Sequence, residues 1–123
     1  MSDNPAINEI GKIYTRPWGT YQTVALGTGY QVKIISVKPG GRLSLQMHFK
    51  RSEHWVCVAG EPTITVDGET KTLGINDAIY IPIESVHRLE NFTKKNASIV
   101  EIQVGGYLGE DDIVRLEDIY NRK

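Results

Sequence analysis

The sequence has little of what stabilises small secreted domains or marks a membrane protein. Its 123 residues include a single cysteine, Cys57, so no disulfide can form within the chain. No apolar run approaches the length of a membrane span, and the first residues, MSDNPAINEIGKIY, lack the basic and apolar regions of a signal peptide. These absences predict a single domain in the reducing environment of the cytoplasm, with no membrane partner.

A concentration of positive charge is also absent. The formal net charge is -1, and the one short basic stretch, KRSEH at residues 50–54, is interrupted at once by an acid. A chain of this kind has no continuous basic surface with which to follow a phosphate backbone. We therefore expect no nucleic-acid partner.

Short runs of alternating or β-branched apolar residues make up most of the chain, with Gly, Pro and Asp turns between them. Residues 1–15 form a polar lead-in, and residues 16–123 are expected to form one all-β sandwich or barrel. The pair Asp67-Gly68 predicts a tight hairpin. Helical spacing is confined to residues 110–123, which predicts a short C-terminal helix carrying Ile113, Leu116, Ile119 and Tyr120 on one face.

The run RLSLQMHF at residues 42–49 alternates with the period of a strand. One face would carry Leu43, Leu45, Met47 and Phe49. The other face would carry Arg42, Ser44, Gln46 and His48. Part of the apolar row needs a cover on the side opposite the polar row, which predicts a homodimer.

Four residues that can donate lone pairs stand on three of these segments: Gln46, His48, Glu53 and His87. The alternation puts Gln46 and His48 on one side of a strand, and a reversal over residues 49–52 could present Glu53 beside His48 on an antiparallel neighbour. Such convergence from different strands is what a divalent ion requires. The alternative is an exposed polar strand that happens to contain a histidine.

The spacing of these residues resembles the first motif of the cupin superfamily. Gly40, Gln46, His48, Glu53 and Gly60 stand at the motif's steps, with glutamine where most cupins have their first histidine. The resemblance implies a cupin jelly-roll barrel and a metal site.

A second cupin motif is recognisable between residues 76 and 91. Pro82, His87 and Asn91 stand at the expected steps, whereas Asn76 and Glu84 replace the usual glycines. Those glycines shape turns and do not bind metal, so the departures concern loop geometry and leave the ligand set intact.

A closer resemblance covers about residues 16–122. The blocks RPWGTY, VKPGGRLSLQMH, RSEHW, YIPIESVHRLEN and GGYLGEDDIVRLEDIY resemble the C-terminal isomerase domain of type II phosphomannose isomerases. In that family the cupin follows a sugar-nucleotide pyrophosphorylase domain, as in bifunctional mannose-6-phosphate isomerase/mannose-1-phosphate guanylyltransferases. No nucleotide-binding loop precedes residue 16, so this chain is expected to be the isomerase module standing alone, and the guanylyltransferase activity is not carried over.

The resemblance implies that Gln46, His48, Glu53 and His87 bind a divalent metal. Zinc is the family's usual ion and the first choice, with manganese, iron, cobalt or nickel also compatible with these donors. The implied reaction is the interconversion of mannose 6-phosphate and fructose 6-phosphate, and the implied partner is a small sugar phosphate. An oxygenase cupin is less favoured, because Gln46 argues against it.

Further residues are candidates for binding and catalysis. Arg42 and Ser44 share parity with the ligands and could bind substrate, and Lys50 and Arg115 could act in catalysis. The alternatives are solvated rim charges and, for Arg115, an arginine on a helix surface. Arg88 should point away from the site, and the general base stays open between Lys50 and His54, the latter with the wrong parity.

A second function also stays open. The chain could be a metal-containing cupin that binds a sugar or sugar phosphate without catalysis. The cations Arg42, Lys50 and Arg115 favour the enzyme, because a pure scaffold does not need them near the metal.

Overall fold

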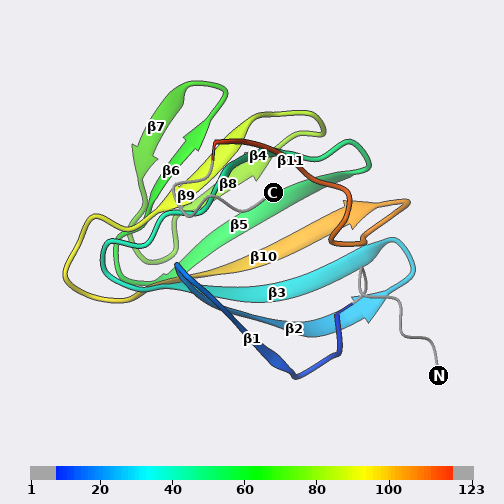
Figure 1. The fold of residues 1–123 in the computed structure, drawn as a ribbon, viewed down its shortest axis with the longest axis horizontal. Coiled ribbons are helices and arrows are strands. Elements are labelled where there is room, and N and C mark those ends of the chain that lie inside the picture. The colour runs from blue at the N-terminus through cyan, green and yellow to red at the C-terminus, as the bar shows by residue number, and fades with distance from the viewer. Residues whose placement is uncertain (1–7, 118–123) are drawn as a thin grey trace.

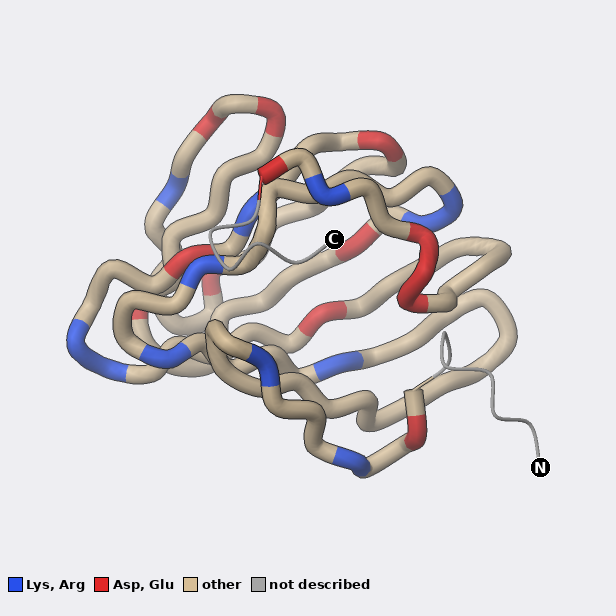
Figure 2. The backbone as a smooth tube through the Cα atoms, viewed as in Figure 1, with Lys and Arg blue, Asp and Glu red and all other residues tan. Residues whose placement is uncertain are grey.

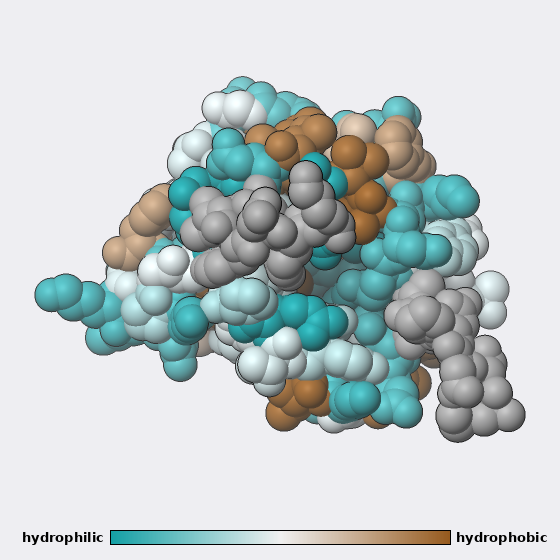
Figure 3. All heavy atoms as spheres, in the orientation of Figure 1, coloured by the Kyte–Doolittle hydropathy of each residue, from teal (hydrophilic) through white to brown (hydrophobic). Residues whose placement is uncertain are grey.

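The computed structural model describes residues 8–117 and consists, over that range, of eleven strands with no helix. The strands form two antiparallel sheets that face one another, with the core between them (Figure 1). Within the same residues no segment forms a helix that could cross a membrane. Lysine and arginine positions are spread over both sheets (Figure 2), and the face seen in Figure 3 is mostly hydrophilic with small hydrophobic groups.

The larger sheet has six strands in the order β1-β2-β3-β10-β5-β8 within the described residues. Their bounds are β1 Ile13–Arg16, β2 Gly19–Gly27, β3 Tyr30–Val37, β10 Ala97–Gly105, β5 Arg51–Ala59 and β8 Ala78–Ile81. The central strands are rich in valine and isoleucine, which favour a pleated, half-buried surface.

The smaller sheet has five strands in the order β11-β4-β9-β6-β7 within the described residues. Their bounds are β11 Val114–Glu117, β4 Leu45–Met47, β9 His87–Glu90, β6 Thr63–Val66 and β7 Glu69–Thr72. β6 and β7 form the predicted hairpin, and Asp67 (φ 48°) and Gly68 (φ 85°) at its turn both have positive φ angles.

The hydrophobic core occupies one end of the space between the sheets. It includes buried side chains from both sheets and from the loops beside them, namely Trp18, Tyr21, Ile35, Val37, Leu43, Trp55, Cys57, Ile64, Leu73, Ile81, Leu89 and Ile99. Cys57 is a free, buried thiol on β5, and burial raises the pKa of this thiol.

The strand expected at residues 42–49 is shorter than its alternation predicts. Only Leu45–Met47 form β4, and Arg42 makes an isolated bridge to Glu90. Leu43 and Ser44 are both buried although they are neighbours, so the two faces do not separate cleanly there. The apolar row that suggested a homodimer thus begins in the core with Leu43, while Phe49 is half exposed. The homodimer itself stays a prediction.

The predicted C-terminal helix is wrong over the described residues. Val114–Glu117 form β11, which pairs with β4, so Leu116 lies on a strand, and Ile113 immediately precedes it. The remaining residues of that prediction, Ile119 and Tyr120, lie outside the described residues. Pairing with the exposed edge of β4 supplies hydrogen bonds that a short, weakly amphipathic helix would have to make alone.

Candidate metal centre

Three of the four predicted ligands converge inside the barrel. One donor atom from each of His48, Glu53 and His87 can be chosen so that all lie within 4.8 Å of one another. All three side chains are buried. His48 Nε2 lies 3.4 Å from Glu53 Oε2, and the two imidazole centroids are 5.1 Å apart.

The cluster joins the two sheets. His87 begins β9 and faces Gln46 of β4 in register, so these two lie on neighbouring strands of the smaller sheet. Glu53 lies on β5 in the larger sheet, and His48 follows β4 directly. Glu53 is therefore not a cross-strand neighbour of His48, as the sequence suggested, because the chain passes from one sheet to the other over residues 48–51 and the two side chains meet across the interior.

Backbone carbonyls orient both imidazole rings. His48 Nδ1 lies 2.6 Å from the Asp112 carbonyl oxygen, and His87 Nδ1 lies 3.0 Å from that of Ser85. A carbonyl can only accept, so each Nδ1 carries the proton and each Nε2 keeps its lone pair. This is the usual way in which a protein fixes the tautomer of a metal-binding histidine.

Gln46 is held by its amide nitrogen. Nε2 donates to the Ser44 carbonyl oxygen at 3.3 Å and to Ser44 Oγ at 3.1 Å. Both bonds use the nitrogen, which leaves the amide oxygen as the atom that Gln46 can offer to a cation. The buried Ser44 thus positions Gln46 in this structure.

The electrostatics put the donors in the protonation states that a metal ion needs. Burial lowers the pKa of His48 to about 4, so its ring is neutral at pH 7. Burial alone would raise the pKa of Glu53, but the guanidinium of Arg51 and the two imidazoles outweigh it and hold that pKa well below its usual value. A neutral imidazole and an ionised carboxylate are the forms that bind divalent cations.

Arg51 occupies the interior beside these donors. Its Nε donates to Glu53 Oε2 at 2.8 Å, and its Nη2 lies 3.2 Å from His48 Nε2. A guanidinium thus takes the same lone pairs that a divalent ion would use. The residues fit such an ion in charge and donor type, provided that Arg51 gives up these two contacts.

Asp112 connects the segment before β11 to this centre. Its carboxylate accepts hydrogen bonds from the backbone nitrogens of Phe49 at 3.0 Å and Lys50 at 2.9 Å. Its carbonyl oxygen is the partner of His48 Nδ1. Asp112 therefore fixes both the turn after β4 and the ring of a candidate ligand.

Polar residues continue from the cluster along the inner face of the larger sheet. Gln31 and Gln103 are partners in register, as are Gln103 and Glu53, and the next row pairs Lys33 with Glu101. We call this region the polar end, defined by the inward side chains of Gln31, Lys33, Arg51, Glu53, Glu101 and Gln103, all of them buried.

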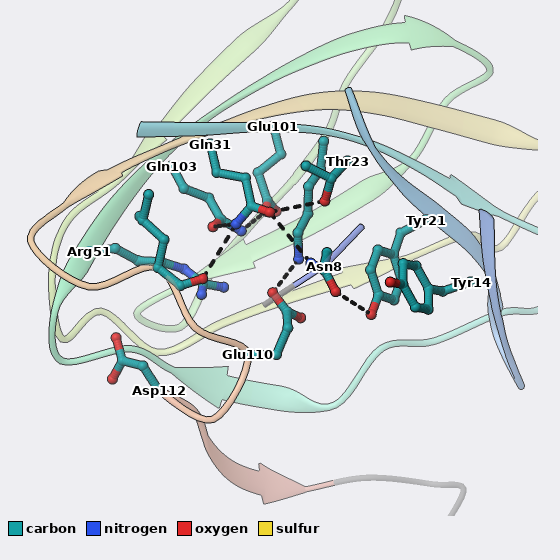
Figure 4. Close-up of polar contacts among 12 residues, drawn as sticks. Asn8, Tyr14, Tyr21, Thr23, Gln31, Arg51, Glu101, Gln103, Glu110 and Asp112 are labelled. Carbon is teal, nitrogen blue, oxygen red and sulfur yellow. Dashed lines mark hydrogen bonds and ion pairs between the residues drawn. The ribbon is translucent and has the colours of Figure 1, made fainter. Parts of the chain in front are cut away.

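A series of hydrogen bonds connects the side chains of the polar end, and Figure 4 shows part of it. Thr23 donates to Gln31, Gln31 donates to Gln103 at 2.9 Å, and Gln103 donates to Glu101 at 2.5 Å. Burial, reinforced by the charge of Glu53, raises the pKa of Glu101 to about 8, against the opposing effects of Lys33 and Arg51. At neutral pH Glu101 is therefore mostly protonated.

Sequence reasoning did not identify the polar end. One signal was present, since Lys33 interrupts an apolar strand, and Glu101 and Gln103 alternate with valine and isoleucine in β10. In a sheet with one face in the core and one face in solvent, that alternation would place the polar residues on the solvent face. Neither Arg51 nor Asp112 stood out, because each lies in a stretch of mixed charge.

The predicted cations are partly or fully exposed. Arg42 is one-third exposed and pairs with Glu90, Nε to Oε2, at 2.5 Å. Lys50 is exposed, with Nζ 5.0 Å from the Tyr107 ring centroid. Arg115 is exposed on β11, where it is the register partner of Gln46.

Two further residues have positions that bear on the predictions. His54 is exposed on the outer face of β5, with its ring centroid 4.7 Å from that of Tyr80. It therefore points away from the cluster, as its parity indicated. Arg88 is buried and donates to the Leu43 carbonyl and to Glu117, which ties β9 to β11.

The two substituted motif positions keep the backbone that a glycine would favour. Asn76 has φ 80° and Glu84 has φ 66°, both in the left-handed region. Gly40 and Gly60 of the first motif also have positive φ, 78° and 69°. The departures from the motif thus change the residue type without changing the turn.

The chain is similar to known proteins over most of its length. The family described as "Mannose-6-phosphate isomerase C-terminal" matches residues 3–118. The alginate biosynthesis protein AlgA of Pseudomonas aeruginosa is 57% identical over 107 residues, which are 87% of this chain and 22% of AlgA. The mannose-1-phosphate guanylyltransferase ManC of Salmonella typhimurium is 53% identical over the same shares. The chain thus spans less than a quarter of the length of these two relatives.

Solved structures show the fold. An oxalate decarboxylase from Lactobacillus farciminis superposes with a TM-score of 0.74 at 19% identity, over 85% of this chain and 33% of that one. A Klebsiella pneumoniae protein with a double-stranded beta-helix domain gives 0.70 at 17% identity over 94% of both chains. A cupin-2 domain protein from Rhodospirillum rubrum gives 0.64 at 20% identity over 69% of this chain and 58% of its own. The fold is all-β and cupin-like, and the chain belongs to the mannose-6-phosphate isomerase C-terminal family.

Proposed function

We propose that the protein is a metal-dependent aldose–ketose isomerase that interconverts mannose 6-phosphate and fructose 6-phosphate. The observation that supports this most strongly is the buried convergence of His48, Glu53 and His87 beside Gln46, with both imidazoles presenting Nε2. A zinc ion suits these nitrogen and oxygen donors, and their neutral or anionic state favours a divalent cation.

The chemistry requires moving a proton between adjacent carbons beside a carbonyl group. A divalent ion held by these four side chains would act as a Lewis acid toward the substrate oxygens. The chain itself would bind and orient the sugar and exclude water from the reacting carbons. A neutral carboxyl such as that of Glu101 can donate a hydrogen bond to a sugar oxygen at the polar end, which an ionised one cannot.

Exposed cations beside the site would stabilise negative charge on the substrate. Arg115 is the register partner of Gln46, so its backbone lies beside a proposed ligand. Lys50 lies between His48 and Arg51 in the chain and is exposed. We propose Arg115 and Lys50 as catalytic residues and Arg42 and Ser44 as substrate-binding residues. In this structure Ser44 acts by holding Gln46.

A non-catalytic sugar-phosphate-binding cupin is the second candidate. The exposure of both Lys50 and Arg115 favours it, because the two proposed catalytic cations are then at the surface of the protein. The short span relative to AlgA and ManC favours it as well, since the activity of the longer proteins need not reside in this part alone.

Turnover separates the two functions. The protein, reconstituted in turn with zinc, manganese, cobalt and nickel, should be assayed against mannose, glucose and fructose 6-phosphates by coupled detection of the product. Conversion of mannose 6-phosphate with at least one metal is the expected result. Stoichiometric metal and sugar-phosphate binding without conversion of any sugar would favour the binding protein.

We also propose a homodimer. Beyond the row that begins at Leu43, the outer face of the larger sheet exposes Val58, Tyr80, Ile102 and Val104. Sedimentation at micromolar concentration should give twice the mass of the chain, and a monomer there would contradict the proposal.

A further inference from the structure

Lys33 has an environment that the metal centre does not explain. It lies on the inner face of β3 with a side chain only 5% exposed, and its Nζ forms an ion pair with Glu110 Oε2 at 2.5 Å. Nζ also lies 4.6 Å from the ring centroid of Tyr21. An ammonium group in an interior needs an anionic partner, because burial without one is costly.

The partner carboxylate comes from a segment that lies outside both sheets. Residues 106–113 form no strand between β10 and β11, and the Glu110 side chain is 30% exposed. Burial would raise the pKa of Glu110, but Lys33 and Arg51 overcome that effect and lower it. Glu110 is thus a partly exposed anion that lies beside the polar end (Figure 4).

A second cation of the polar end has a hydrogen-bond donor without a partner among the described residues. Within the described residues, Arg51 Nη1 is a buried donor with no hydrogen-bond partner, on a side chain that is 95% buried. The charge of Arg51 nevertheless acts on Glu110 strongly enough to lower its pKa. One carboxylate pairs with Lys33 and leaves a donor of Arg51 unmet. An anion with three terminal oxygens could serve both cations.

Resting on the proposed function, we propose that Lys33 receives the phosphate group of the sugar phosphate and that Glu110 occupies this anion position until the phosphate displaces it. Asp112 stays tied to Phe49 and Lys50, so only the preceding part of the segment has to move. With the phosphate bound at Lys33, the carbons of the sugar would point toward the metal centre, which lies in the same interior between the two sheets. Glu110 would thereby act as a built-in competitor that weakens the binding of smaller anions.

Substitutions that remove one charge and keep a similar side-chain size test the proposed phosphate site directly. Glu110→Gln keeps the shape and removes the competing charge, so the protein should bind mannose 6-phosphate and inorganic phosphate about tenfold more tightly. Lys33→Gln should weaken mannose 6-phosphate binding by about tenfold or more and leave the affinity for unphosphorylated mannose unchanged. Titration calorimetry on metal-loaded protein gives these constants, with circular dichroism as the check on folding. Glu69→Gln and Lys71→Gln, on the exposed strand β7, are the matched controls.

The wild-type chain provides a second measurement that does not depend on a variant folding. Adding inorganic phosphate should shift the amide NMR signals of residues 106–111 and leave those of β7 in place. The proposal is overturned if these signals do not move, if Glu110→Gln binds phosphate no more tightly than wild type, or if Lys33→Gln binds mannose 6-phosphate as wild type does.

The same experiments distinguish this proposal from the proposed function. Lys33-dependent phosphate binding in a protein that isomerises no sugar would retain the anion site and refute the isomerase. Isomerisation with a KM that Lys33→Gln leaves unchanged would retain the isomerase and refute the anion site.

Discussion

The inner face of β3, β10 and β5 is apolar at one end and polar at the other, along the same three strands. At the apolar end, the register rows bring together Val37 with Ala97, and Ile35 with Ile99 and Cys57. At the polar end, the rows bring together Lys33 with Glu101, and Gln31 with Gln103 and Glu53. The change occurs within one step of the strand period.

This difference separates the part of the interior that stabilises the fold from the part that contains the candidate site. Burial of apolar side chains stabilises the fold, whereas buried charges stabilise it weakly even when they are paired. The polar end contains the charged residues Lys33, Arg51 and Glu53, beside the mostly neutral Glu101. Such a group of charges in an interior is what a site for a metal ion and an anionic substrate requires.

Removing a histidine should have the largest effect. His48→Ala and His87→Ala should each lose the bound ion and any isomerase activity that depends on it, because one of only four donors is gone. Both variants should also unfold at a lower temperature than metal-loaded wild type. Elemental analysis and thermal unfolding measure these changes. Full metal content in both variants would show that the ion binds elsewhere, and His54→Ala, on the outer face, is the matched control.

A cavity at the apolar end should cost stability without affecting the metal. Ile99 is fully buried, and Ile99→Ala should lower the free energy of unfolding by about 2–5 kcal/mol. Metal content should stay at the wild-type level. Ile102→Ala, on the outer face of the same strand, should change stability by much less. Equal losses for the two variants in chemical denaturation would contradict the assignment of inner and outer faces.

Arg115→Ala should reduce turnover while leaving metal content and folding intact. Loss of one charge-assisted contact in a transition state is worth about 2–4 kcal/mol, or roughly a hundredfold or more in rate. Arg115→Lys should recover little if the contact is a bidentate fork. Steady-state kinetics with mannose 6-phosphate measure both. If Arg115→Ala turns over substrate at the wild-type rate, this arginine has a structural role on β11 and no catalytic one.

The smallest effect concerns the pH dependence of stability. Because burial raises the pKa of Glu101 from 4.5 to about 8, the folded chain holds this proton more tightly than the unfolded chain does. Between these values stability therefore falls as the pH rises. Glu101→Gln should remove that loss and raise the free energy of unfolding at pH 8 by roughly 1–3 kcal/mol.

Denaturant unfolding of metal-free protein at pH 5 and pH 8 tests this. At pH 5 the variant and wild type should differ much less than at pH 8. A variant that is less stable than wild type at pH 8 would mean that Glu101 is ionised and paired in the folded protein.

The sequence predicted a hairpin turn and the central strands of the fold well. Asp67-Gly68 predicted the β6–β7 hairpin, and the β-branched runs predicted the central strands. The helix expected around Ile113 and Leu116 is wrong, because three- and four-residue spacing in so short a segment cannot outweigh pairing with the edge of β4.

The candidate ligands could be predicted, but their surroundings could not. The spacing of a sequence motif identifies the ligands: Gln46, His48, Glu53 and His87. Lys33, Glu101 and Glu110 come together only through strand register and a loop that returns to β3 from far along the chain. In β10 the outward positions Val100, Ile102 and Val104 are apolar, so the rule that apolar residues face inward gives the inverted orientation there.

The dependence of isomerase activity on metal occupancy tests the central claim most directly. Wild-type protein should be stripped by a chelator and reloaded in steps with zinc, and its conversion of mannose 6-phosphate measured at each occupancy. The account predicts no activity without metal and a linear rise that ends at one ion per chain. Full activity in the stripped protein, or no activity with zinc or any other divalent metal at full occupancy, would contradict it.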